Sequence, residues 1–141
     1  RVHCAILAGG KVKTWFCRQM PKVLGLKFKA EVKRQERVNA KVRYIEGGMT
    51  QQELEEFNSK FEEIPEPLTE SEKDKWMASL SGVSLSSDAF FPFPDSIDIA
   101  SRFGVKYIAQ TGGSLRDDLV INACDSYDMV CAVTGIRLFH H

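Results

Sequence analysis

Four features in the last third of the chain could bind a ligand: an aromatic corner, an acid, a glycine-rich turn and an arginine. Phe90 and Asp95 lie in the sequence FFPFPD, Thr111–Leu115 reads TGGSL, and Arg137 lies near the carboxyl end. A glycine-rich turn that runs into a helix offers backbone N–H groups and the positive end of the helix dipole to an anion. An arginine can bind a phosphate or carboxylate through two parallel hydrogen bonds. Together these features predict an anion-binding site beside an aromatic platform.

Each feature also has an ordinary structural interpretation. Taken alone, the TGGS sequence is more typical of a plain turn before a helix than of an anion site, and Arg137 alone is more typical of a surface ion pair. The site interpretation therefore depends on whether the fold brings these residues together.

The pattern of predicted helices and strands around these residues indicates that the fold brings them together. Val83–Phe91 alternates like a strand, Pro92 and Pro94 stop it, and Asp95 is the expected N-cap of the next helix. The full series is strand Val83–Phe91, helix Asp95–Phe103, strand Val105–Ala109, helix Ser114–Tyr127 and strand Met129–Thr134. A βαβαβ series implies parallel strands, whose carboxyl ends share one edge of the sheet. The segments Phe90–Asp95, Thr111–Leu115 and Thr134–Arg137 should therefore meet at that edge.

The first half of the chain is predicted to be helical. Residues 1–20 indicate a helix or helix pair interrupted near Gly9-Gly10, residues 27–45 indicate a second helix, and residues 51–66 look linker-like. The strongest helix is predicted over Leu68–Leu80, where Thr69 and Glu72 form a capping box. We expect a basic-then-acidic helical segment over residues 1–67 and an α/β subdomain over residues 68–141.

Composition limits the classes of function. The chain has 141 residues, of which 43% are hydrophobic and 27% charged, as in an ordinary globular protein. The four cysteines form no CxxC pair and the histidines have no ligand-like spacing, so we expect no metal site, no disulfide framework and a cytosolic location. No apolar run approaches the length of a membrane span, and we expect no signal peptide.

The zero net charge hides an uneven distribution of charge. Residues 1–45 carry 12 Lys and Arg against 2 Asp and Glu, whereas residues 46–79 carry 3 against 10. A basic segment could bind nucleic acid, but this one lacks the interleaved aromatics of single-strand binders. We favour a cationic surface that meets an acidic partner or a small polyanion, and we expect no nucleic-acid partner.

Several stretches resemble one family closely. These are SLSSDAFFPF, INACDS and the closing RLFHH, together with RVHCAILAGGK and VLGLKFKAEVKR in the first part of the chain. They are similar to the formyltransferase region of the bifunctional purine-biosynthesis protein, AICAR formyltransferase/IMP cyclohydrolase. The similarity covers essentially all 141 residues and is weakest from Gly47 to Glu66.

The resemblance implies a three-layer, cytidine-deaminase-like α/β fold. It implies the carboxyl-terminal part of a phosphoribosylaminoimidazolecarboxamide formyltransferase, which moves a formyl group from 10-formyltetrahydrofolate to AICAR without a metal, in the synthesis of IMP. It also implies a homodimer with sites formed across the subunit interface. The catalytic Lys-His pair of the family lies upstream, so the resemblance implies no catalytic residue in this chain, which we expect to be inactive alone.

The resemblance also assigns roles to individual residues. Those expected to bind AICAR are Arg1, Phe90 on the imidazole ring and Arg137 on the phosphate; those expected to bind folate are Val2, Asp95 on the pterin, Ser114 and Leu115. The chain departs from the family pattern around this site, at Pro94, Leu115, Val133 and Gly135. The alternative hypothesis is a non-catalytic module that is derived from the family and that binds ligand or mediates dimerisation.

Overall fold

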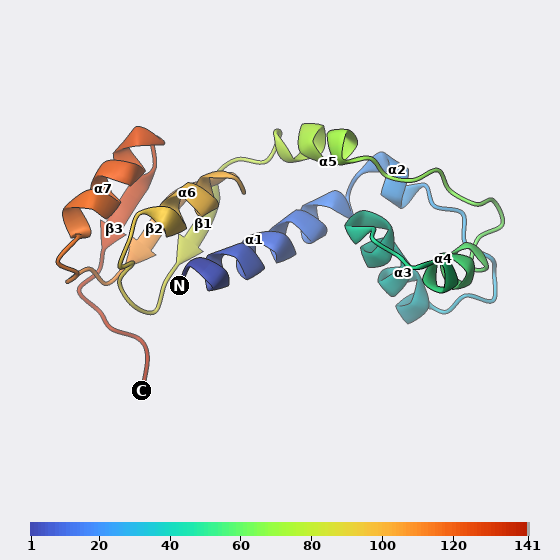
Figure 1. Ribbon diagram of the computed structural model, residues 1–141, viewed down its shortest axis with the longest axis horizontal. Coiled ribbons are helices and arrows are strands. Elements are labelled where there is room, and N and C mark those ends of the chain that lie inside the picture. The colour runs from blue at the N-terminus through green and yellow to red at the C-terminus, as the bar shows by residue number, and fades with distance from the viewer. Residues whose placement is uncertain (141) are drawn as a thin grey trace. The chain divides into compact units, whose positions relative to one another are not determined.

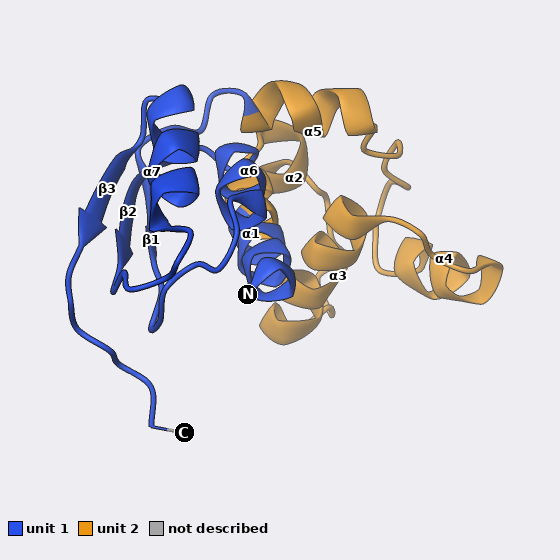
Figure 2. Cartoon of the chain, turned by 60° about the vertical axis from the view of Figure 1, so that its left-hand side comes forward, with its two compact units in different colours: residues 1–12, 78–141 blue, residues 13–77 orange. Residues whose placement is uncertain are grey.

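The computed structural model describes residues 1–140 as seven helices and three strands; His141 lies outside the described residues. In chain order they are α1 (Val2–Cys17), α2 (Pro21–Leu24), α3 (Arg34–Glu46), α4 (Gln51–Asn58), α5 (Glu70–Met77), β1 (Val83–Ser86), α6 (Asp95–Ser101), β2 (Val105–Gln110), α7 (Asp117–Ser126) and β3 (Val130–Val133), as Figure 1 shows. The chain forms two compact units, which Figure 2 distinguishes by colour. Unit 1 comprises residues 1–12 and 78–141, and unit 2 comprises residues 13–77. The division predicted between residues 67 and 68 stays a prediction.

Unit 1 is built on a parallel three-stranded sheet in the order β1-β2-β3, which confirms the predicted α/β class and βαβαβ series. Helices α6 and α7 lie on the same side of the sheet (Figures 1 and 2). Their apolar side chains and those of the strands form one core, which includes Ile97, Ile108, Val120 and Cys124. A crossover helix between successive parallel strands, as α6 and α7 are here, is the arrangement that buries such a sheet face.

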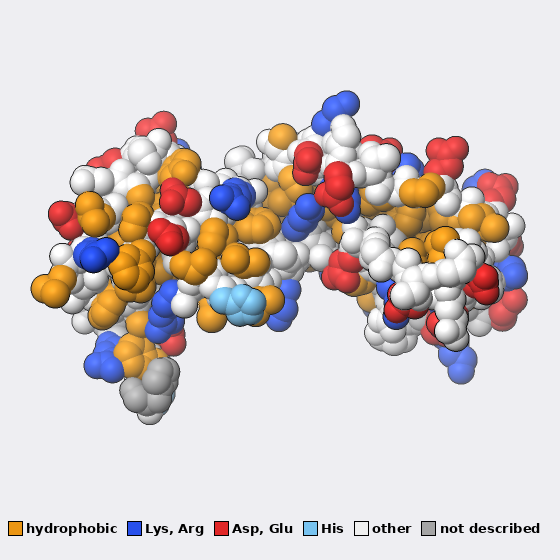
Figure 3. All heavy atoms as spheres, viewed as in Figure 1, with side chains coloured by type: hydrophobic (Ala, Val, Ile, Leu, Met, Phe, Trp, Pro, Cys, Tyr) orange, Lys and Arg blue, Asp and Glu red, His pale blue; other side chains and the backbone are white. Residues whose placement is uncertain are grey.

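The opposite face of the sheet is open in the described residues. Tyr107 is 50% exposed and its register partner Val130 is 56% exposed. Figure 3 views unit 1 from the other side, that of α6 and α7, where apolar side chains also reach the surface. The third layer of the predicted cytidine-deaminase-like subdomain therefore stays a prediction.

Several elements of unit 1 begin or end at other residues than predicted, and three of these differences bear on the site. Strand β1 ends at Ser86 rather than at Phe91, although Ala89 and Phe91 are buried. Their alternation thus reflects packing of the following loop rather than a longer strand. Helix α7 begins at Asp117, three residues after the predicted start at Ser114. Asp95 is not the N-cap of α6: Pro94 holds that position and makes no side-chain cap bond, while Asp95 is already in the first turn.

The predicted interruption at Gly9-Gly10 is also wrong, because α1 runs through both glycines. A side chain at position 9 would collide with the ring of Phe103, so glycine allows this close approach. Glycine costs a helix interior about 1 kcal/mol relative to alanine, and tertiary packing can offset that cost.

Unit 2 is helical and has its own core, formed around Cys17, Val23, Tyr44, Phe57 and Phe61. The segment predicted to be linker-like is instead anchored in that core, since Phe57 and Phe61 are 4% and 3% exposed. It contains α4, whose N-terminus carries a reciprocal capping box between Thr50 and Glu53. Its polar, acidic composition and the prolines at 65 and 67 suggested a linker, but Phe57 and Phe61 bury their rings in the core.

The two other predicted helices of unit 2 are shorter than expected. The helix predicted over residues 27–45 begins only at Arg34, because Phe28 forms an antiparallel bridge with Phe61 instead. The helix predicted over Leu68–Leu80 is α5, and its Thr69–Glu72 capping box is confirmed.

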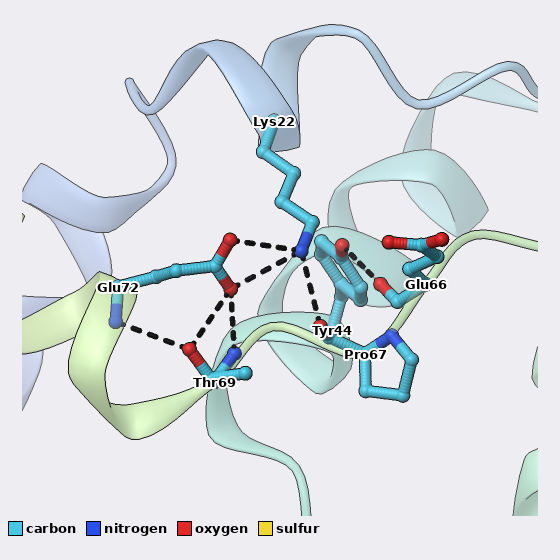
Figure 4. A network of polar contacts seen from close by, with 6 residues as sticks. All are labelled: Lys22, Tyr44, Glu66, Pro67, Thr69 and Glu72. Atoms are coloured by element: carbon cyan, nitrogen blue, oxygen red, sulfur yellow. Dashed lines mark hydrogen bonds and ion pairs between the residues drawn. The ribbon is translucent and has the colours of Figure 1, made fainter.

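Figure 4 shows that the Glu72 carboxylate of this box also binds Lys22, at 3.0 Å from Nζ to Oε1. Nearby, the hydroxyl of Tyr44 donates to the Glu66 carbonyl at 2.6 Å, so side chains tie the segment before α5 to α2 and α3.

Candidate ligand-binding site

The loops that follow the three strands of unit 1 meet at the carboxyl edge of the sheet, as predicted. The backbone N–H of Gly135 donates to the carbonyl of Thr111 at 3.0 Å, joining the loops after β3 and β2. The N–H of Leu138 donates to the carbonyl of Asp88 at 3.0 Å, joining the segments after β3 and β1. This edge is where parallel α/β sheets bind ligands.

A buried glutamine holds the aromatic loop at this edge. Gln110, the last residue of β2, is fully buried, and its Oε1 accepts from the backbone N–H of Phe91 at 2.8 Å. Phe91 is 4% exposed, whereas the adjacent Phe90 is 39% exposed. The anchored residue therefore presents its neighbour as an accessible aromatic ring. Gln110 was missed in the sequence because a glutamine inside an apolar strand gives no signal of what its side chain binds.

The two predicted arginines converge on one ring that sequence reasoning left unassigned. The Arg137 guanidinium carbon lies 3.9 Å from the centre of the Phe139 ring, and that of Arg1 lies 6.0 Å from it. Cations over an aromatic face are attracted by its negative quadrupole. Residues at opposite ends of the chain thus form one cationic cluster at the sheet edge.

Asp88 sets the charge balance of this cluster, and it too was unassigned. Its carboxylate forms an ion pair with Arg1 and accepts a hydrogen bond from the Arg1 guanidinium. Arg137 makes no ion pair within residues 1–140, so its charge is the uncompensated one. Asp88 lies in the motif SSDAFF and Phe139 in the motif RLFHH. Only the fold shows that these two residues contact the two arginines.

The TGGSL turn does not offer the free donors that its sequence predicts. The carboxylate of Asp117 accepts from the N–H of Gly113 at 2.7 Å and from that of Ser114 at 3.1 Å. The hydroxyl of Ser114 in turn accepts from the N–H of Arg116 at 3.1 Å. The position that an anion would take on these two N–H groups is filled by the chain's own carboxylate, so the prediction is wrong for this pair of donors.

The predicted folate residues differ in exposure. Leu115 is completely exposed at the tip of the turn, while Ser114 and Val2 are half-buried. Asp95 is exposed on the first turn of α6, and its carboxylate makes no hydrogen bond or ion pair within the described part of the chain. Its oxygens are thus free to accept from a ligand, but no contact joins these four residues into one cluster.

No group of three or more His, Cys, Asp and Glu side chains in the described residues could hold a metal ion. No helix among residues 1–140 is long and apolar enough to cross a membrane.

Comparison with known proteins finds relatives of the chain. No known family model matches it. Over 72 residues, however, it is 49% identical to the bifunctional purine biosynthesis protein PurH of Clostridioides difficile (strain 630). The match covers 51% of this chain and 14% of the relative. The chain therefore spans only a small part of the length of the relative that it matches, and the resemblance seen in its motifs is confirmed over about half of its own length.

Proposed function

The chain is related over about half of its length to the bifunctional purine biosynthesis proteins, and from this premise we propose that it contributes the ligand-binding part of an AICAR formyltransferase. In this role it binds AICAR and 10-formyltetrahydrofolate for formyl transfer in IMP synthesis, within a cytosolic bifunctional enzyme that also has IMP cyclohydrolase activity. No residue of this chain is proposed as catalytic, and the transfer needs no metal.

The observation that carries the proposal is the convergence of Arg1 and Arg137 on Phe139 at the sheet edge. AICAR combines a phosphate with a flat imidazole ring. Arg137 has no ion-pair partner in residues 1–140 and suits the phosphate, while the exposed ring of Phe90 suits the imidazole. Arg1 is paired with Asp88, so we propose that it orients the nucleotide rather than balancing most of its charge.

The folate is proposed to bind at the opposite end of the aromatic loop. A pterin ring presents N–H donors, and the unpaired carboxylate of Asp95 is an acceptor for them. The apolar side chain of Leu115 and the neighbouring Ser114 and Val2 are proposed to contact the rest of the folate. Because Asp117 occupies the donors of the TGGSL turn, we assign that turn to contacts through side chains rather than to an anion.

The exposed apolar side chains of unit 1 support the proposed homodimer. Monomeric proteins rarely expose large contiguous apolar patches to water. A large exposed apolar patch therefore often marks a surface that binds another protein chain. The exposed apolar residues outside the helices include Phe90, Phe93, Leu115, Val130, Val133, Ile136 and Leu138.

A ligand-binding or dimerisation module without catalysis is the second candidate. The acid nearest the arginine cluster, Asp88, is tied to Arg1 and is not placed as a free base. The two candidates differ in turnover, since the module binds AICAR and transfers no formyl group even in the natural polypeptide.

The proposal is tested by titrating AICAR into the natural polypeptide and its Arg137→Gln variant in a calorimeter. Loss of the phosphate contact should cost about 2–4 kcal/mol of AICAR binding free energy, with folate affinity unchanged. Arg102→Gln is the matched control, because Arg102 is an exposed arginine at the end of α6. Equal AICAR affinity in the Arg137→Gln variant and the wild type would remove Arg137 from the site.

A further inference from the structure

Unit 2 contains a second candidate site, separate from the sheet edge of unit 1. A groove of about 370 Å³ lies between the end of α1 and the middle of α3. It is lined by Trp15, Arg18, Gln19, Val38 and Lys41. The lining holds two cations, one indole and one carboxamide, and it has no carboxylate.

Helix geometry explains why these residues face one another. Trp15 lies in the last turn of α1 and Arg18 in the turn directly after it, where the Arg18 backbone N–H donates to the Thr14 carbonyl at 3.1 Å. Val38 and Lys41 are three residues apart on α3. Residues at this spacing lie on one face of a helical segment. The end of α1 with the turn after it and the middle of α3 thus each supply one apolar and one cationic side chain to the groove.

The indole of Trp15 is unusually accessible. It is 53% exposed, although tryptophan is highly buried on average. One side of it is supported, because its ring stacks against that of Phe16 with centroids 6.3 Å apart and planes at 29°. A supported, exposed ring can stack with a planar ligand without first ordering a flexible side chain.

The two cations of the groove are half-buried and unpaired. Arg18 and Lys41 make no ion pair within residues 1–140. Other lysines of the same unit are compensated: Lys22 binds Glu72 (Figure 4), and Lys73 binds Glu70. Removing a cation from water without a counter-charge is unfavourable, so an anion in this groove would relieve the cost.

We propose that this groove binds a nucleoside phosphate. The base stacks on Trp15 and the phosphate lies between Arg18 and Lys41. Gln19 donates through Nε2 to the Trp15 carbonyl at 3.4 Å, which leaves its Oε1 to accept from an amino group on the base. The proposal is independent of the formyltransferase site, since all of these residues belong to unit 2.

The test is a titration of AMP into the whole 141-residue chain, followed by the fluorescence of Trp15. The second tryptophan, Trp76, is half-buried and donates to the Phe16 carbonyl at 2.8 Å, so Trp76→Phe in every protein isolates the Trp15 signal. We expect saturable quenching by AMP and weaker binding of both adenosine and inorganic phosphate. Arg18→Gln and Lys41→Gln should each weaken AMP binding at least about tenfold.

Lys75→Gln is the matched control, because Lys75 is an exposed lysine of unit 2 outside the groove. It should leave AMP affinity unchanged. A Lys75→Gln variant that loses as much affinity as Arg18→Gln would overturn the proposal by showing a diffuse charge effect. Three other results would also overturn it: no quenching by AMP, equal binding of phosphate alone, or binding of a single-stranded oligonucleotide but not of AMP. Circular dichroism of each variant excludes unfolding as the cause.

Discussion

The backbone N–H of Phe91 donates to the side-chain oxygen of Gln110 at 2.8 Å, and both residues are buried. This bond connects the last residue of β2 to the loop that carries Phe90. It explains how an exposed aromatic ring can be held in place at the edge of the sheet, although its loop lies outside β1.

Gln110→Leu should therefore destabilise unit 1 and loosen the aromatic loop. The substitution leaves the buried N–H of Phe91 without an acceptor, at a cost of about 1–3 kcal/mol. It also removes Nε2, which is buried and has no partner in residues 1–140, and this offsets part of the loss. Urea unfolding measures the effect, with Tyr107→Phe on the exposed face of the same strand as control. Unchanged stability and AICAR affinity would show that the bond does not position the loop.

Asp95→Asn should weaken the binding of folate far more than the binding of AICAR. The amide keeps the size of the side chain but loses one acceptor and the charge that favour a pterin's N–H donors. In the natural polypeptide we expect the KM for 10-formyltetrahydrofolate to rise about tenfold or more, with the KM for AICAR nearly unchanged. Asp118→Asn is the matched control, because Asp118 is an exposed acid in the first turn of α7. Equal changes in both constants would assign Asp95 a structural role only.

The Glu72 carboxylate should make unit 2 sensitive to acid. Hydrogen bonds from the Thr69 backbone, and then from Lys22, hold the pKa of Glu72 below its ordinary value of 4.5. A carboxyl whose pKa is lower in the folded state stabilises the fold above its unfolded pKa, and this contribution disappears as the pH falls through the folded pKa. The free energy of unfolding should thus fall as the pH drops below about 4.5, and less steeply in Glu72→Gln.

The control for this pH series is Glu31→Gln, since Glu31 is exposed and makes no ion pair in the described residues. Its unfolding free energy should follow that of the wild type at every pH. A Glu72→Gln variant with the wild-type slope would contradict the assignment.

The cysteines should differ in reactivity. Cys4 is exposed, whereas burial and the neighbouring Cys131 raise the pKa of the Cys124 thiol from 9.0 to about 12. Burial also raises the pKa of Cys17. Because the thiolate is the reactive form, iodoacetamide at pH 8 should modify Cys4 well before Cys17 or Cys124. Mass spectrometry of timed samples measures this order, and the same reaction in urea should remove it. Early modification of Cys124 in the folded chain would contradict its burial.

Local pattern was enough to predict much of unit 1. The alternation after Val83, the breaks at Pro92 and Gly104, and the helix between them predicted the βαβαβ order because each is a property of neighbouring residues. The parallel topology then required the three loops to share an edge. The capping box at Thr69 and Glu72 was predictable for the same reason, since its partners are only three residues apart.

Contacts between distant residues decided the rest. The helix α1 continues through Gly9, where the glycine allows the ring of Phe103 to lie close by, and Phe28 leaves the helical pattern because it meets Phe61. The donors of the TGGSL turn are taken by the Asp117 carboxylate, so the turn does not offer them to an anion. The sequence by itself determined the order of elements and the types of side chain available for binding. Only the tertiary structure decided that Arg1 and Arg137 share the Phe139 ring, because no local interaction links the two ends of a chain.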